Sequence, residues 1–224
     1  MAFSYSPKIV TDGLVFAVDA ANKKSYPGSG TTWTDLAGSN NGTLTNGPTF
    51  DSGNGGSLVF DGTNDYTSFL TAPLNFSSTN FSIEAIFKTT TNGVDVILGQ
   101  YPGGGDWWMG INSSKLWFSI SLPSAKIEPK TSFNVNDNQW KIATATINNS
   151  TYEVKLYVNG DLADTKSGTG SYPNSSNNFT IGRFGNNSSF QFPGSIAEVK
   201  IYNKVLSSTE ITQNYNALKS RFGL

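Results

Sequence analysis

Apolar residues alternate with polar ones, or form short runs, along most of this chain. Clusters of Gly, Asn, Pro and Ser separate the runs, which is typical of many short strands joined by turns. We expect strands at Gly13 to Asp19, Ser57 to Asp61, Tyr66 to Leu70, Phe81 to Lys88, Val94 to Gln100, Trp107 to Ile111, Lys115 to Leu122, Trp140 to Ile147, Tyr152 to Val158, Asn178 to Phe184 and Gly194 to Tyr202. Asn159-Gly160 is a hairpin turn signal, because both residues tolerate positive φ. Strands this numerous, with short polar turns, predict packed antiparallel sheets.

One segment near the C-terminus has a helical pattern instead. Ser207 to Glu210 reads Ser-Ser-Thr-Glu, a capping box, and Ile211, Tyr215 and Leu218 then recur at helical spacing. We expect a short helix that lies over an edge or an open end of the sheets. No shift in composition marks a linker, so we predict a single domain over residues 1–224, with residues 1–56 as an N-terminal segment packed on it.

The composition excludes several classes of function. Charged residues make up 14 % of the chain, against roughly 25 % in an average globular protein, and the net charge is -1. A nucleic-acid partner is therefore not expected. The chain has no Cys and no His, which excludes disulfides, thiolate metal sites and Ser-His-Asp or Cys-His catalysis within it. No segment approaches the ~18 apolar residues of a membrane span, and the first twenty residues lack a secretion signal, so we expect neither membrane insertion nor signal-directed export.

Three blocks of sequence in fixed order carry a family resemblance. They are Leu58 to Tyr66 followed by Phe81 to Phe87, then Trp140 to Gly160, then Ile181 to Ser207. Together they resemble the laminin-G-like jelly rolls of the concanavalin A-like lectin and glucanase superfamily. The resemblance implies an all-β fold, an antiparallel jelly-roll β-sandwich of two curved sheets, here with one short C-terminal helix. It also implies a groove or edge that often binds sugar, and frequently a calcium ion at one rim.

The leading part of the chain, Gly13 to Phe50, is similar to a variant common in proteins of tailed phages. This similarity implies a component of the virion, made in the host cytoplasm, with other virion proteins and further copies of itself as partners. The sequence departs from the family pattern at two positions. Ala197 stands where many relatives carry an acidic residue, which weakens the case for a metal at that rim, and Lys141 stands where relatives carry histidine.

Glycosidases of this superfamily need two carboxylates about 5 Å apart, usually from a Glu-x-Asp-x-x-Glu strand. No such run exists here, and the glutamates are scattered. They are Glu84, Glu128, Glu153, Glu198 and Glu210. We therefore predict that the protein is not an enzyme and has no catalytic residues.

The turn Asp61-Gly62-Thr63-Asn64-Asp65 offers oxygen atoms to a metal. Carboxylate and amide oxygens from Asp61, Asn64 and Asp65 suit calcium, the one cofactor that the sequence suggests. The alternative is a hairpin turn in which these side chains bond their own backbone, and the sequence favours this second use.

Two tryptophans stand side by side in the stretch GGGDWWMG, Gly103 to Gly110. Neighbouring side chains of a strand point to opposite faces, so Trp107 and Trp108 cannot both enter one core. We expect that Trp108 packs inward and that Trp107 faces outward with Met109. An outward indole presents a flat apolar surface on which a sugar ring can stack.

A glycan site around the outward ring also needs polar groups. Tyr101, Asp106 and Arg183 would supply a second ring and hydrogen-bonding partners, and the same alternation predicts that Trp117 leaves the main apolar face. The alternative is that the N-terminal segment, Trp33 included, covers this face and makes both rings structural.

Two functions of different class follow from these patterns. The first is a non-catalytic, virion-associated binding module that recognises glycan on a host surface or decorates the capsid or tail. The second is a purely structural capsid or tail protein that stabilises the particle through subunit contacts, and a glycoside hydrolase is a distant third.

Overall fold

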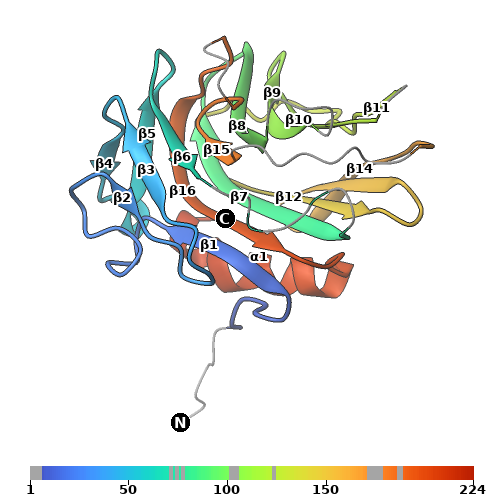
Figure 1. The fold of residues 1–224 in the computed structure, drawn as a ribbon, viewed down its shortest axis with the longest axis horizontal. Coiled ribbons are helices and arrows are strands. Elements are labelled where there is room, and N and C mark those ends of the chain that lie inside the picture. Colours follow the sequence, from blue (N-terminus) through green and yellow to red (C-terminus); the bar gives the residue numbers. More distant parts are fainter. Residues whose placement is uncertain are drawn as a thin grey trace.

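The computed structural model describes residues 7–70, 73, 76, 79–100, 106–122, 125–170, 179–185 and 189–224. Two antiparallel sheets pack face to face (Figure 1). Sheet A contains β1 (Leu14–Asp19), β4 (Thr49–Asp51), β5 (Ser57–Asp61), β7 (Phe81–Thr89), β12 (Lys141–Asn148), β13 (Glu153–Val158), β14 (Asp161–Ser167) and β16 (Pro193–Tyr202). Sheet B contains β2 (Thr32–Trp33), β3 (Gly42–Thr45), β6 (Tyr66–Phe69), β8 (Val94–Gln100), β9 (Trp107–Asn112), β10 (Lys115–Ser121), β11 (Lys126–Ile127) and β15 (Phe179–Ile181).

The strand order mixes segments that are distant in sequence. Sheet A runs β14-β13-β12-β7-β16-β5-β4, with β1 paired to β16, and sheet B runs β11-β10-β9-β8-β15-β6-β3-β2. The all-β, two-sheet fold class with one C-terminal helix is confirmed. The β13–β14 hairpin is also as predicted, with φ of 52° at Asn159 and 86° at Gly160.

The N-terminal segment is part of both sheets. It supplies β1 and β4 to sheet A and β2 and β3 to the edge of sheet B, and a short 3-10 helix, η1 (Gly53–Gly55), precedes β5. Trp33 on β2 is fully buried in the core, so it does not cover the outer face of sheet B as the structural alternative required. The segment therefore completes the sandwich rather than lying on top of it.

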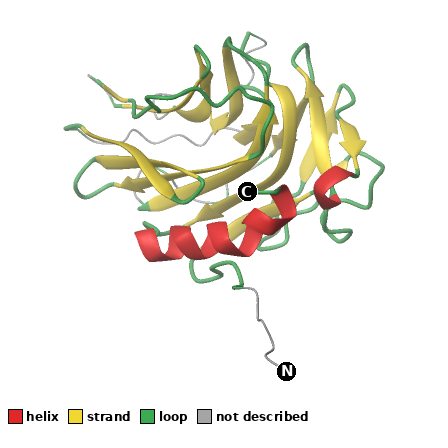
Figure 2. Ribbon diagram, turned by 180° about the vertical axis from the view of Figure 1, so that it is seen from behind, coloured by secondary structure: helices red, strands yellow, loops and turns green. Residues whose placement is uncertain are grey.

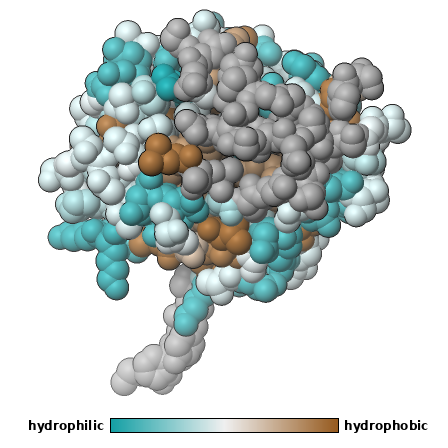
Figure 3. Space-filling view, viewed as in Figure 1, coloured by the Kyte–Doolittle hydropathy of each residue, from teal (hydrophilic) through white to brown (hydrophobic). Residues whose placement is uncertain are grey.

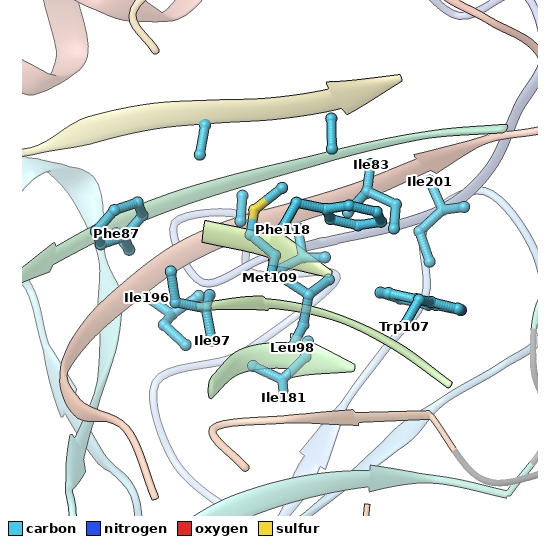
Figure 4. Close-up of a cluster of buried hydrophobic side chains, with 14 of the residues drawn as sticks. Ile83, Phe87, Ile97, Leu98, Trp107, Met109, Phe118, Ile181, Ile196 and Ile201 are labelled. Atoms are coloured by element: carbon cyan, nitrogen blue, oxygen red, sulfur yellow. The ribbon is translucent and has the colours of Figure 1, made fainter. Parts of the chain in front are cut away.

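The space between the sheets is filled by one apolar cluster that draws on both of them. Ile83, Phe87, Ile196 and Ile201 of sheet A meet Leu98, Trp107, Met109, Phe118 and Ile181 of sheet B (Figure 4). Trp107 is enclosed by aromatic rings, including Phe76 at a centroid separation of 4.9 Å, and its Nε1 donates to the buried Gln100 Oε1 at 3.2 Å. A buried indole N–H with a partner is a stable arrangement.

The helix α1 (Ser208–Phe222) begins as the sequence predicts. The Ser207 hydroxyl accepts the Glu210 N–H, and the Glu210 carboxylate accepts the Ser207 N–H at 2.8 Å, which completes the capping box. Its position differs from the prediction: α1 lies across the outer face of sheet A and not over an edge (Figure 2). The reason is that β7 and β16 are buried on both faces, so their outward side chains need a cover.

An ionic network lies under α1. Lys200 on β16 is fully buried, with its Nζ 2.9 Å from Glu84 Oε1 and 2.6 Å from Glu198 Oε1. Arg221 of α1 reaches down to Asp19 Oδ1 at 3.0 Å and to Glu198 Oε2 at 3.8 Å. Burial opposes the charge on Lys200, but the charges of Glu198 and Glu84 outweigh it and raise the Lys200 pKa. The network therefore ties the helix to the sheet through opposite charges.

The outer surface is polar with little charge. On the face in Figure 3, the described residues show several apolar patches among hydrophilic and neutral residues. Within the described part of the chain, no helix has the length and apolar character needed to cross a membrane.

Candidate functional site

The paired tryptophans of β9 point in the opposite sense to the prediction. Trp107 is 0 % exposed and faces the core with Met109, whereas Trp108 is half-buried on the outer face of sheet B. The sequence held the signal for this choice. One set of alternate positions on β9 is wholly apolar, namely Trp107, Met109 and Ile111. The other set is mixed, because Gly110 and Asn112 accompany Trp108. A fully enclosed Trp107 cannot stack on a ligand, so its assignment to a glycan site was wrong.

Trp108 is one member of a row of aromatic rings across the outer face of sheet B. Trp117 on β10 faces outward as predicted and stacks with Trp108, with centroids 6.3 Å apart and planes 26° apart. Phe184 follows β15, and its ring meets Trp108 edge-on at 6.4 Å, above Gly99 of β8. Tyr66 lies on the same face of sheet B, on β6, two strands beyond β8. We call Trp117, Trp108, Phe184 and Tyr66 the aromatic row.

The aromatic row crosses the strands with an offset, because Trp117 lies opposite Gly110, two residues along β9 from Trp108. It extends from β10 through β9, β8 and β15 to β6, which is four interstrand steps or about 19 Å at roughly 4.8 Å per step. All four rings are half-buried, so each has one surface against the sheet and part of its area open. Such a row has the length and the flat apolar surface to hold a chain of several sugar rings.

Polar groups accompany the rings at the β10 end. The Lys130 Nζ lies 5.0 Å from the centroid of the Trp117 ring, and Lys130 itself is exposed. Glu128 accepts a hydrogen bond from the Ser119 hydroxyl at 2.9 Å, and Ser119 pairs with Trp108 across the strands. Planar carboxylates and hydroxyls beside an aromatic face are the groups that recognise sugar hydroxyls.

Arg183 closes the other end of the aromatic row. Its guanidinium carbon lies 3.2 Å from the centroid of the Tyr66 ring, and its backbone carbonyl accepts the Thr180 hydroxyl at 2.8 Å. Burial lowers the pKa of Arg183, and Tyr66 acts in the opposite direction. Of the residues predicted for the glycan site, Arg183 is the one that the structure places beside the row.

Asp106 and Tyr101 are the other two predicted partners. Asp106 is half-buried at the start of β9, where its backbone carbonyl accepts the Ser121 N–H at 2.8 Å. Tyr101 lies outside the described residues. The sequence analysis missed Phe184 and Tyr66, because nothing local in the sequence brings β6 and the end of β15 together with β9.

The oxygen-rich turn after β5 uses its carboxylates on its own backbone. Asp61 Oδ1 accepts the N–H groups of Thr63 at 2.8 Å and Asn64 at 3.3 Å, and Asp65 Oδ2 accepts the Asp61 N–H at 3.1 Å. These backbone donors lower the pKa of Asp61, led by Thr63, whereas burial raises that of Asp65. In the described part of the chain, no three acidic side chains gather as a metal site. The arrangement matches the turn alternative, and calcium at Asp61, Asn64 and Asp65 stays a prediction.

Every Asp and Glu of the chain lies within the described residues, so the carboxylates can be compared directly. Glu84 and Glu198 do come together from β7 and β16, which the sequence analysis did not foresee. They are 1 % and 5 % exposed, both bind Lys200, and α1 lies over them. A polysaccharide cannot reach this pair, because it lies in a packed layer between sheet and helix.

A hollow of about 370 Å³ lies on another part of the surface, where the β13–β14 hairpin approaches the loop before β12. Its walls include the exposed side chains of Phe133 and Leu162 and the ion pair between Asp137 and Lys141. It has one aromatic ring and no aromatic row residue among its lining residues.

Comparison with known proteins gives a family match. The Laminin_G_3 family model, described as the concanavalin A-like lectin/glucanases superfamily, matches residues 61–212. This range includes every member of the aromatic row. No curated protein shows significant similarity to the sequence.

Several solved structures share the fold. The binding domain of Paraclostridial Mosquitocidal Protein 1 has a TM-score of 0.75 and 19% identity, covering 92% of this chain and 52% of that chain. The botulinum neurotoxin serotype D binding domain has a TM-score of 0.72 and 16% identity, covering 91% and 51%. The Botulinum Neurotoxin Type G Receptor Binding Domain has a TM-score of 0.69 and 14% identity, covering 91% and 51%. The chain spans about half the length of these structures, and at such identities the likeness shows the fold alone.

Proposed function

Since the chain belongs to the concanavalin A-like lectin and glucanase superfamily, we propose that it is a non-catalytic binding module that holds a glycan along the aromatic row. The observation that carries this proposal is the stacked pair of Trp108 and Trp117 on the outer face of sheet B. Large aromatic rings are normally placed in a core, and a half-buried row of them on an outer face is a candidate binding surface. The likeness to structures titled as binding or receptor-binding domains supports a binding role over a catalytic one.

The chemistry of the row favours sugar over other ligands. The face has little charge, which disfavours nucleic acid. Sugar rings stack their C–H faces on indole rings, while Glu128 and Lys130 offer hydrogen bonds to hydroxyl groups at the margin.

The expected setting, a virus particle that meets host glycans, is part of this proposal. Many copies on one particle would let weak individual contacts act together, so a millimolar affinity for a single site is sufficient. The module would then act as an attachment or decoration protein, with other virion proteins or further copies of itself as neighbours.

A glycan array probed with the purified protein tests the proposal. We expect a specific set of glycans to bind, and we expect Trp108→Ala to weaken their binding at least tenfold, about 1.4 kcal/mol. Phe133→Ala is the matched control, because it removes a ring that is 47 % exposed but belongs to the separate hollow. Trp108→Phe should retain part of the affinity. Equal binding by wild type and Trp108→Ala would refute the proposed site.

One set of residues favours the second candidate, a structural protein that contacts neighbouring subunits. Three large apolar side chains are strongly exposed: Leu70 at 86%, Leu162 at 55% and Phe133 at 47%. Under this candidate, wild type would bind no glycan and would self-associate at high concentration, and Leu162→Asp would shift the sedimentation profile toward monomer. Under the favoured candidate, Leu162→Asp leaves glycan binding unchanged.

A further inference from the structure

The chain has two arginines, and they differ in their partners. Arg221 pairs with Asp19 and Glu198 between α1 and sheet A. Arg183 forms no ion pair, although all 16 Asp and Glu residues of the chain lie within the described part of the structure. Its Nε is buried and donates to no acceptor there. Arg183 is therefore a partly buried cation for which this chain supplies no anion.

Such an arrangement is unfavourable in the free protein. Charged groups that leave water are normally paired, and a buried donor without an acceptor loses its hydration without compensation. Tyr66 offsets part of this loss through its ring, which faces the guanidinium at 3.2 Å. An unpaired arginine held in this way is ready to receive an anion.

The backbone around Arg183 is held in place. The Thr180 hydroxyl donates to the Arg183 carbonyl at 2.8 Å and accepts the Gly185 N–H at 2.9 Å. Gly182 has φ of 87°, and a Cβ there would meet the Phe60 ring, so only glycine fits the turn. The arginine is thus presented by a rigid turn at the end of the aromatic row, which reduces the entropy lost on binding.

We infer that the glycan held by the aromatic row is acidic, and that a sugar carboxylate pairs with Arg183. This inference rests on the proposed function. The planar guanidinium suits a planar carboxylate, which it can bind through two parallel hydrogen bonds. The exposed Lys130 at the far end, beside Trp117, offers a second positive charge to an acidic chain. The net charge of -1 supplies no long-range attraction, so selectivity comes from the local pairing.

A glycan array in which each carbohydrate is present in neutral, carboxylated and sulfated forms tests the inference. We expect wild type to bind carboxylated members at least tenfold more tightly than their neutral counterparts. Arg183→Leu should remove this preference, so that carboxylated members bind no more tightly than their neutral counterparts. Lys219→Leu is the matched control, since it removes a lysine whose Nζ lies 5.4 Å from the Tyr215 ring centroid on α1, away from the row.

The outcomes separate the two proposals. If Arg183→Leu keeps the full preference for carboxylates, or if wild type prefers neutral glycans, the inference is wrong while the aromatic row remains the binding site. A stronger Arg183-dependent preference for sulfated members would also overturn the carboxylate assignment. If neither wild type nor Trp108→Ala binds any member, the proposed function itself fails. The Arg183→Leu protein should unfold at the same urea concentration as wild type or at a higher one, because the substitution removes an unpaired charge. A lower unfolding midpoint would show that Arg183 has a structural role instead.

Discussion

Replacing Lys200 by Met tests the buried network under α1. The side chain of Lys200 is 0 % exposed and its Nζ contacts two carboxylates, at 2.9 Å and 2.6 Å. Met has a similar volume, so the change removes the charge with little loss of packing. Glu84 and Glu198 would then remain buried without the cation they share. Glu84 would keep its hydrogen bonds from Thr144 and Asn214, and Glu198 would keep Arg221 at 3.8 Å. Removing one partner of a buried ion pair costs about 3–5 kcal/mol, which is a large part of the 5–15 kcal/mol typical of a domain.

Urea unfolding followed by tryptophan fluorescence measures this loss. Lys155→Met is the control, because Lys155 lies in the same sheet and pairs with Glu153 at 2.8 Å, but both side chains are more than a third exposed. A surface pair of this kind contributes about 0–1 kcal/mol. A loss in Lys200→Met no greater than that in Lys155→Met would refute the reasoning about burial.

The dependence on pH gives a second check on the same variant. Burial already raises the pKa of Glu198, and Lys200 opposes this shift. Without Lys200, the folded-state pKa of Glu198 rises further above its unfolded value. Protonation then favours the folded state, so the stability deficit of Lys200→Met relative to wild type should shrink as the pH falls from 7 to 5. Adding Glu84→Gln and Glu198→Gln to Lys200→Met should restore a folded protein at pH 7.

Three further changes test the local structure. Gly110→Ala should lower the free energy of unfolding by about 1–3 kcal/mol in urea titrations, because a Cβ there would collide with the Asp95 carbonyl. An unchanged free energy of unfolding would contradict this close packing of the strands. Ser207→Ala should cost about 1 kcal/mol in thermal unfolding through loss of the N-cap, whereas Ser208→Ala should not. Asp61→Ala should lower the unfolding temperature equally in calcium and in chelator, since its carboxylate binds backbone N–H groups; a deficit confined to calcium would establish a metal site instead. These donors lower the Asp61 pKa, so its stabilisation is present at neutral pH and disappears as the pH falls through that pKa.

Several elements were predictable because their signals are local. The alternation of apolar residues placed β5 and β8 with the bounds observed, and the capping box placed the start of α1. The short edge strands β2, β4 and β11 were not predicted, since two or three residues carry no measurable period. The predicted position of α1 was wrong because a helical pattern shows which side of the helix is apolar, but not which surface of the sheets that side will pack against.

The candidate site was only partly predictable for a related reason. Alternation showed that one of Trp107 and Trp108 must face outward, and parity with Met109 and Ile111 decides which one does. Arg183 was selected from the sequence as a polar partner, but its stacking on Tyr66 depends on the pairing of β6 with β15.

The sequence by itself determined the class of this protein. The period-two alternation of apolar residues predicts sheets, because it is a property of local residue order. The absence of His and Cys excludes the chemistry of those two side chains, because it is a property of composition. Tertiary structure alone decided which residues meet. Strands distant in sequence become neighbours in a sheet, so a row of rings drawn from positions 66 to 184, and an arginine without a carboxylate, exist only once the strands have paired.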